Sequence, residues 1–194
     1  MKIDKATILS EFRTNGAEEL LPMVSRCQAT LLYEDDGKIL GVMSACLVNA
    51  TEDAAWNVIL DYDSYHRFMS GINVSQVISR NDNEYVVKFE AGLKIMGVGA
   101  IVKYTYRLVV EKPYANVFNA ANGKPIGYWA VFPAGDPGQV VIVHADVAKD
   151  IKNINNFVRF LIQTMPTAEI GLHISPVVMM VNRMKKRIEQ VHAG

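Results

Sequence analysis

The residues of this sequence best suited to proton transfer are its four histidines and the carboxylates near two of them. Glu169 and His173 stand four positions apart in a stretch with helical periodicity, so their side chains share one face of a helix. If that face borders a cavity, the pair could act as general acid and base; if it faces solvent, it is an ordinary helix pair. His144 and Asp146 alternate along a strand on the side that we predict to face outward, which favours a surface pair.

Other kinds of catalytic site have little support in the sequence. None of the four histidines has a second histidine or a cysteine at a spacing typical of metal ligands, so we expect no metal site and no cofactor. There is no GxSxG nucleophile motif. Asp61 and Asp63 follow a predicted helix, where capping and turn formation are their expected roles.

Composition favours one globular domain. The chain has 194 residues, of which 50% are hydrophobic, enough for a sizeable core. Twenty basic residues balance twenty acidic ones, so we expect no nucleic-acid partner. No stretch resembles a signal peptide or a transmembrane segment. We therefore expect a cytoplasmic protein, with transient membrane contact and the oligomeric state left open. Cys27 and Cys46 could pair across a hairpin, but we expect them to be buried thiols.

The elements that must position these residues form an α+β arrangement. Strand-forming stretches joined by turn residues occupy most of residues 24–147, interrupted by a helical corner at residues 51–69 that contains two short helices. Helical periodicity returns after residue 153 and continues through a long carboxy-terminal helix that contains Pro176. We predict a curved antiparallel sheet of about seven strands and a long terminal helix.

Strand parity predicts which side chains face the interior. Along residues 85–91 and 98–110, charged side chains alternate with aromatic and aliphatic ones, which indicates a solvated outer face and an apolar inner face. Residues 128–132 are apolar on both faces, and we take Tyr128 and Phe132 as inward. The charges predicted to face outward are Lys88, Glu90, Lys103 and Arg107.

A resemblance to a known family comes from the helical corner. The corner reads Trp56-x-x-x-x-Asp61-Tyr62-x-x-Tyr65-x-x-Phe68-Met69-x-Gly71. Together with Gly127-Tyr128-Trp129, Pro133 and the proline-interrupted terminal helix, this pattern resembles the START-like (SRPBCC) helix-grip superfamily, especially its polyketide cyclase/dehydrase and coenzyme Q-binding branch. His66 and Ser70 stand where relatives often have prolines. The resemblance implies a helix-grip domain at residues 39–194 and leaves residues 1–38 as an amino-terminal extension or an extra helix or hairpin strand.

The resemblance implies a cavity between the sheet and the long helix, where the superfamily binds lipids, quinones, sterols or polyketides and some members catalyse cyclisation or dehydration. We expect a noncatalytic binding or transport protein for a lipid-like or quinone-like molecule. The alternatives are a polyketide cyclase/aromatase or dehydratase that uses Glu169, His173 or a cavity tyrosine, and a module that binds a protein partner. The predicted ligand-binding residues are Phe89, Tyr104, Tyr106, Tyr128, Phe132, Val177, Met180, Val181 and Met184, and the predicted cavity gate is Tyr62, Tyr65, Phe68 and Met69.

Overall fold

A single antiparallel sheet organises the protein. The computed structural model describes residues 4–14, 16–20, 24, 27–95, 98–148, 156–165 and 167–193. Within these residues, eight strands form one sheet in the order β1-β2-β8-β7-β6-β5-β4-β3. The strands are β1 (Ala29–Tyr33), β2 (Ile39–Asn49), β3 (Ile72–Asn81), β4 (Glu84–Ile95), β5 (Val98–Glu111), β6 (Tyr114–Asn119), β7 (Pro125–Pro133) and β8 (Gln139–Val147). The expected meander is confirmed, with β1 as an additional edge strand.

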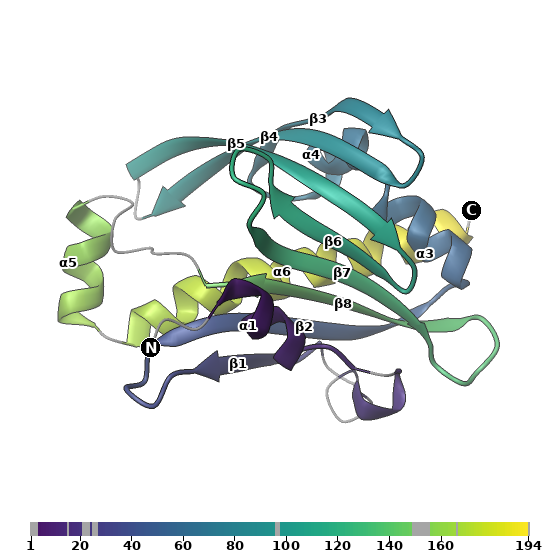
Figure 1. The fold of residues 1–194 in the computed structure, drawn as a ribbon, viewed down its shortest axis with the longest axis horizontal. Coiled ribbons are helices and arrows are strands. Elements are labelled where there is room, and N and C mark those ends of the chain that lie inside the picture. The colour runs from purple at the N-terminus through teal and green to yellow at the C-terminus, as the bar shows by residue number, and fades with distance from the viewer. Residues whose placement is uncertain are drawn as a thin grey trace.

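Helices cover both faces of this sheet. Figure 1 shows the long α6 running along one face, with α5 at one end of the molecule and α3 at the other. We call the face that contacts α6 the inner face and the opposite one the outer face. The helices are α1 (Lys5–Glu11), η1 (Glu18–Leu20), α3 (Glu52–Ile59), η2 (Tyr62–Ser64), α4 (Tyr65–Phe68), α5 (Asn156–Thr164) and α6 (Thr167–Ala193).

The corner formed by α3, η2 and α4 is fixed by local hydrogen bonds. Thr51 caps α3, since its hydroxyl accepts from the Ala54 N–H at 3.3 Å, and acidic residues fill the first turn. The Tyr65 hydroxyl donates to the Ile59 carbonyl at 2.6 Å and ties α4 to α3. An Asp63 carboxylate oxygen accepts a backbone N–H of β3 at 2.7 Å. The corner is therefore anchored to the sheet on which it packs.

Polar contacts set the position of α6 along β2. Lys185 Nζ donates to the Leu47 carbonyl at 2.6 Å and lies 2.7 Å from Glu189 Oε1, which accepts the Asn49 N–H at 3.1 Å. Apolar side chains three or four positions apart form a stripe beside these polar residues, as an amphipathic pattern predicts. The fully buried members are Val181, Met184 and Ile188.

The amino-terminal segment covers the outer face of β2, β7 and β8. Phe12 of this segment is buried there, and a Cβ on Gly41 of β2 would lie only 2.7 Å from its ring. The Tyr128 hydroxyl donates to the Phe12 carbonyl at 2.7 Å, and the Tyr114 hydroxyl donates to the Thr14 carbonyl at 2.8 Å. The central strands are therefore buried on both faces.

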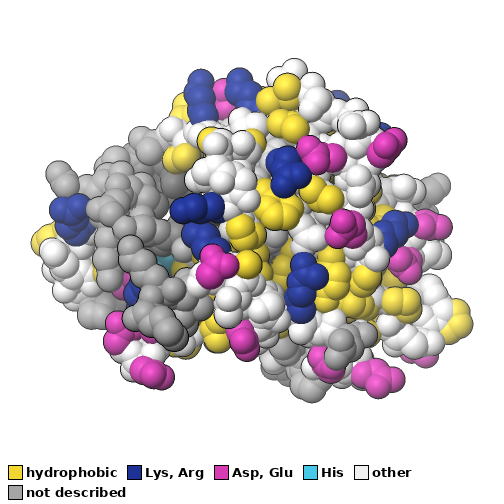
Figure 2. All heavy atoms as spheres, in the orientation of Figure 1, with side chains coloured by type: hydrophobic (Ala, Val, Ile, Leu, Met, Phe, Trp, Pro, Cys, Tyr) yellow, Lys and Arg dark blue, Asp and Glu magenta, His cyan; other side chains and the backbone are white. Residues whose placement is uncertain are grey.

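Beyond this cover, the outer face of β4 and β5 is charged. Glu90 Oε1 lies 3.5 Å from Lys88 Nζ and 3.2 Å from Lys103 Nζ, and Arg107 donates to Glu84 at 3.0 Å. Figure 2 shows acidic and basic side chains interspersed among the described residues of the face in view. The predicted outward orientation of these charges is confirmed.

The two cysteines correct a prediction. Cys27 and Cys46, expected as buried thiols, form a disulfide with Cα atoms 4.4 Å apart. The register of β1 with β2 pairs Ala29 with Ser44, and continuing that antiparallel register backward brings Cys27 opposite Cys46. Our expectation rested on the redox conditions of the cytoplasm and gave too little weight to this register.

Candidate functional site

Three aromatic rings of β4 and β5 line the inner face. The centroid of Phe89 lies 5.5 Å from that of Tyr104 and 5.9 Å from that of Tyr106, and the two tyrosines are 4.6 Å apart. Phe89 is buried, whereas both tyrosines are only half-buried although they pack against the inner core. The predicted inward orientation of these rings is confirmed. Their role as a ligand wall stays a prediction.

The residues predicted to gate the cavity continue this aromatic surface. The Tyr65 ring lies 5.2 Å from Tyr62, 5.4 Å from Phe68 and 6.2 Å from Phe89. Tyr62, Tyr65 and Met69 are buried, and burial together with neighbouring Tyr85 raises the pKa of Tyr62. Because these side chains already belong to the core, opening a gate here requires the corner to move. The gate stays a prediction.

Of the four residues predicted to form the helix wall, three are buried and Met180 is half-buried. Val181 and Met184 are completely buried in the core shared with α3 and the sheet. Val177 packs against Val42 of β2. Met180 is half-buried and borders the same core as the tyrosines of β5. Met180 is therefore the most accessible member of the predicted helix wall.

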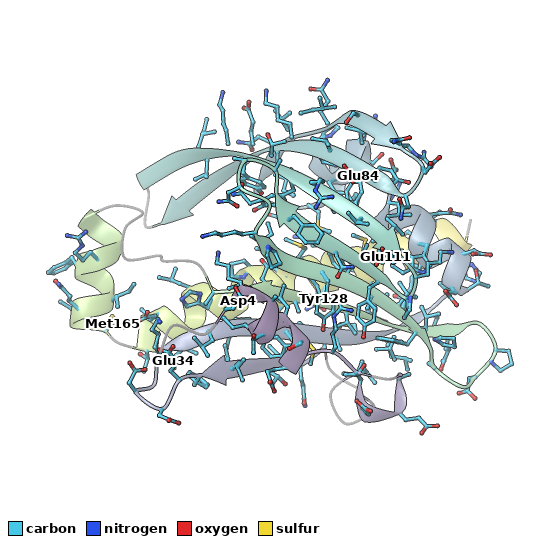
Figure 3. The ribbon with its side chains drawn as sticks, in the orientation of Figure 1. Asp4, Glu34, Glu84, Glu111, Tyr128 and Met165 are labelled. Atoms are coloured by element: carbon cyan, nitrogen blue, oxygen red, sulfur yellow. A yellow bond between two sulfur atoms is a disulfide. The ribbon has the colours of Figure 1, made fainter. Side chains whose placement is uncertain are left out.

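Tyr128 and Phe132 do not face this space, and our choice of them as inward residues was wrong. Both belong to the core beneath the amino-terminal segment, and Figure 3 marks Tyr128 in this region. Trp129 and Val131, the alternate residues of β7, face α6 instead. The prediction failed because both faces of β7 are buried, so the strand has no polar face that would reveal which side chains point outward.

His144 also lies on the opposite face from the one we predicted. It is 4% exposed and stacks on Trp129 of the inner core, with ring centroids 4.3 Å apart. Its Nδ1 lies 3.0 Å from the Tyr128 carbonyl oxygen, which can only accept, so Nδ1 carries a proton and donates. Its Nε2 lies 3.5 Å from Asp146 Oδ1. His144, expected on the surface, is therefore part of the interior, and Asp146 is half-buried on the same face.

The Asp146 carboxylate lies near two other residues of the inner face. Burial raises the pKa of the Tyr106 hydroxyl, and the nearby Asp146 carboxylate raises it further. Gly127, opposite Asp146 in the sheet, leaves room for this carboxylate: a Cβ at Gly127 would meet the carboxylate itself and would lie 2.5 Å from the Ala145 carbonyl oxygen. Gly127 is the sequence signal for this carboxylate, and it belongs to the Gly127-Tyr128-Trp129 motif on which the family resemblance rests.

Glu169 and His173 lie near the start of α6, and both are half-buried. Their role as an acid–base pair stays a prediction. Across the described part of the chain, no group of three or more His, Cys, Asp or Glu side chains is arranged to hold a metal ion. None of the described helices combines the length and the apolar character needed to cross a membrane.

Two surface hollows border these elements. One, of about 330 Å³, lies where β5 extends past the end of β6, and Tyr104 connects it to the inner aromatic rings. Its lining residues are Lys88, Lys103, Tyr104, Thr105, Asn119 and Ala121. The other, of about 360 Å³, is lined by residues of α3, η2, β3 and β4, including Asp61, Asp63 and Arg80. Lys88 and Lys103 of the first hollow belong to the charged outer face, whereas Tyr104 belongs to the inner aromatic rings.

A curved antiparallel sheet that holds a long carboxy-terminal helix against an aromatic inner face defines the helix-grip class of folds. The family model described as polyketide cyclase/dehydrase and lipid transport matches residues 48–167, and the chain belongs to this family. A search of curated proteins finds no match. The predicted fold and family resemblance are thus confirmed; the coenzyme Q-binding branch in particular is not distinguished.

Solved structures show the same fold at low sequence identity. The Zhui aromatase/cyclase from Streptomyces sp. R1128 is 16% identical, with a TM-score of 0.53 over 77% of this chain and 93% of that one. The human StAR-related lipid transfer protein 5 is 10% identical, with a TM-score of 0.53 over 97% and 96%. A STAR-related lipid transfer protein fragment from Xanthomonas axonopodis is 12% identical, with a TM-score of 0.53 over 84% and 99%. These similarities establish the fold.

Proposed function

We propose that the protein binds a hydrophobic small molecule, lipid-like or quinone-like, between the inner face of the sheet and α6. The observation that supports this most is the incomplete burial of inward-facing side chains. Tyr104, Tyr106 and Met180 border the inner core but remain half-buried, whereas Val181 and Met184, further along the helix, are fully buried. A ligand in contact with the first three would complete their burial.

The driving force for such binding is removal of apolar surface from water. A ligand that buries about 300 Å² of apolar surface gains about 7 kcal/mol before the costs of association. The aromatic rings of Phe89, Tyr104 and Tyr106 favour flat or unsaturated groups, because rings stack at centroid distances like those seen between these side chains. Met180 adapts to irregular shapes through its flexible side chain.

Adjacent methionines of α6 provide a matched test. Met180→Trp places a large ring at the border of the inner core, and Met179→Trp places the same ring at a position that is 42% exposed. We expect wild-type protein and the Met179 variant to carry an apolar ligand in native mass spectrometry, or to bind one from a panel of lipids and quinones. The Met180 variant should bind that ligand about tenfold more weakly or worse. A wild-type protein that carries none and binds none would contradict the proposal.

Catalysis of cyclisation or dehydration is the second candidate function. It is favoured by polar side chains on the inner face, His144 and Asp146, beside the aromatic rings. The similarity to an aromatase/cyclase concerns the fold, and fold does not fix chemistry. An assay with a linear poly-β-ketone analogue would test it: cyclised product formed by wild type and lost in Asp146→Asn or His144→Phe would support catalysis, and product at the background rate would oppose it.

A further inference from the structure

The disulfide between Cys27 and Cys46 joins the amino-terminal segment to the inner core. Val24 still belongs to the outer core beneath this segment, whereas Cys27 packs against the inner core that contains Cys46. The chain therefore passes round the edge of the sheet just before β1, and the disulfide fastens it there. We propose that this bond is a site of thiol–disulfide exchange, and that its reduction by a dithiol loosens β1 beneath α6.

The two cysteines differ in exposure. Cys46 is completely buried, whereas Cys27 is half-buried. A dithiol in solution therefore reaches the disulfide from the side of Cys27. Its first thiolate attacks Cys27 Sγ, the S–S bond breaks, and Cys46 leaves as a thiolate that takes up a proton. The second thiolate of the reductant then displaces Cys27 in the same way, so two electrons pass to the protein and the reductant becomes a cyclic disulfide.

The backbone at Cys27 depends on the disulfide. Its φ is 47°, in the left-handed region that residues other than glycine rarely adopt. The next residue is held by two hydrogen bonds, since the Gln28 carbonyl accepts the Ala45 N–H at 3.3 Å and the Ser44 hydroxyl at 3.0 Å. Reduction removes the covalent bond that keeps Cys27 in this conformation. The turn then relaxes, and the pairing of β1 with β2 frays from that end.

β1 in turn supports the first half of α6, the helix that forms one wall of the proposed ligand space. Ala29 and Leu31 of β1 pack against the cluster that contains Val177, and Ile174 packs on the same cluster. The second half of α6 is held separately, by its fully buried side chains and by the bond from Lys185 to a carbonyl of β2. Among the described strands, β1 pairs with β2 alone. Fraying of β1 therefore uncovers the first half of α6 and leaves the second half in place.

Counting of thiols tests whether the folded protein undergoes this exchange. Oxidised wild-type protein is incubated with dithiothreitol, quenched with acid, and alkylated in denaturant before mass spectrometry. We expect both cysteines to become reduced at a rate that urea scarcely changes below the unfolding transition, because attack at Cys27 does not require unfolding. A reduction rate that rises with urea in parallel with the unfolded fraction would overturn the proposal.

Hydrogen exchange followed by mass spectrometry tests what reduction loosens. Exchange times are chosen at which β4 and β5 stay protected in the oxidised protein. After reduction, we expect peptides that cover β1 and residues 170–177 to exchange about tenfold faster or more, and peptides that cover residues 181–190 to change by less than about twofold. The melting temperature should fall by about 6–12 °C, because the bond constrains a loop whose ends are 19 positions apart.

Cys27→Ser reproduces the reduced state without a reductant, since it removes the disulfide at the half-buried position and leaves Cys46 in the core. It should show the exchange pattern of reduced wild type, and dithiothreitol should leave that pattern unchanged. If this variant does not fold, chemically reduced wild type carries the same test.

Two results of the exchange experiment would overturn the proposal. One is equal exchange of β1 before and after reduction, and the other is an equal increase over β1, β4 and β5, which would mean a general loss of stability. Neither measurement uses a ligand, so these results would leave the proposed function standing.

Discussion

Replacing Tyr128 by phenylalanine distinguishes a structural role for this side chain from a role in ligand binding. The Tyr128 hydroxyl is buried and donates to the Phe12 carbonyl at 2.7 Å, on the face opposite α6. Tyr128→Phe removes that bond and leaves a buried carbonyl without this donor. We expect it to lower the free energy of unfolding by about 1–3 kcal/mol, the usual cost of such a loss.

The assay is urea unfolding followed by tryptophan fluorescence, with thermal melting as a second measurement. For a domain of this size, each kcal/mol lowers the melting temperature by about 2–4 °C. Tyr33→Phe is the matched control: its side chain is 44% exposed on β1, and we expect a change within about 0.5 kcal/mol. Ligand affinity should be unchanged in both variants.

A different pair of results would refute this reasoning. If Tyr128→Phe unfolds within about 0.3 kcal/mol of wild type but loses ligand affinity, the hydroxyl contributes to binding and not to the amino-terminal packing. The inward orientation predicted from the sequence would then be correct, and the packing of Phe12 on β7 would not describe the protein in solution.

Three further predictions concern the outer face of the sheet. Phe12→Ala should destabilise the protein by about 3–5 kcal/mol in urea unfolding, whereas Phe160→Ala, at a position 60% exposed, should change stability by less than about 0.5 kcal/mol. Gly41→Ala should cost about 1–3 kcal/mol, because its Cβ would lie 2.7 Å from the Phe12 ring, and a smaller cost in the Phe12→Ala background would identify that contact as the cause. A hydrogen bond from Lys103, together with the charges of Lys103 and Lys88, lowers the pKa of Glu90, so NMR titration of Lys103→Met should show that pKa rising towards 4.5. The folded-state pKa of Glu90 is depressed, so its small contribution to stability is present above the unfolded-state pKa and is lost as the pH falls through the folded-state pKa. An unchanged Glu90 pKa in Lys103→Met would contradict this assignment.

Sequence reasoning succeeded where one face of a strand meets water. Along β4 and β5, Lys88 and Lys103 alternate with Phe89 and Tyr104, and the structure confirms both orientations. Alternation carries this information because a solvated face accepts charge at little cost and a buried face does not. The order of the helices and strands could also be predicted, because periodicity and turn residues are local signals.

The same reasoning failed where both faces are buried. The amino-terminal segment covers the outer face of β7 and β8, so Tyr128 and Trp129 are both buried and their types do not reveal which one faces α6. His144 was assigned to the surface because it is polar, but a backbone carbonyl and an aromatic ring satisfy it in the interior. One signal in the sequence indicated this cover: Ile8 and Phe12 form an apolar pattern near the amino terminus, and such a pattern has to pack against another surface.

The candidate site was predicted in part. Phe89, Tyr104 and Tyr106 follow from strand parity, and Met180 follows from helical spacing. The stack of His144 on Trp129 depends on the pairing of β8 with β7 beneath a covered outer face, and no local pattern encodes it. Long-range proximity of this kind had to come from the structure.

The central claim is that an apolar molecule occupies the space between the sheet and α6. The most direct measurement is an intermolecular NOE experiment on protein labelled at its methionine methyl groups, with a ligand taken from the lipid and quinone panel. We expect cross-peaks between ligand protons and the Met180 methyl group, and none to Met179, which faces solvent on the same helix. Cross-peaks to Met179 without any to Met180 would place the ligand outside the fold and contradict the account.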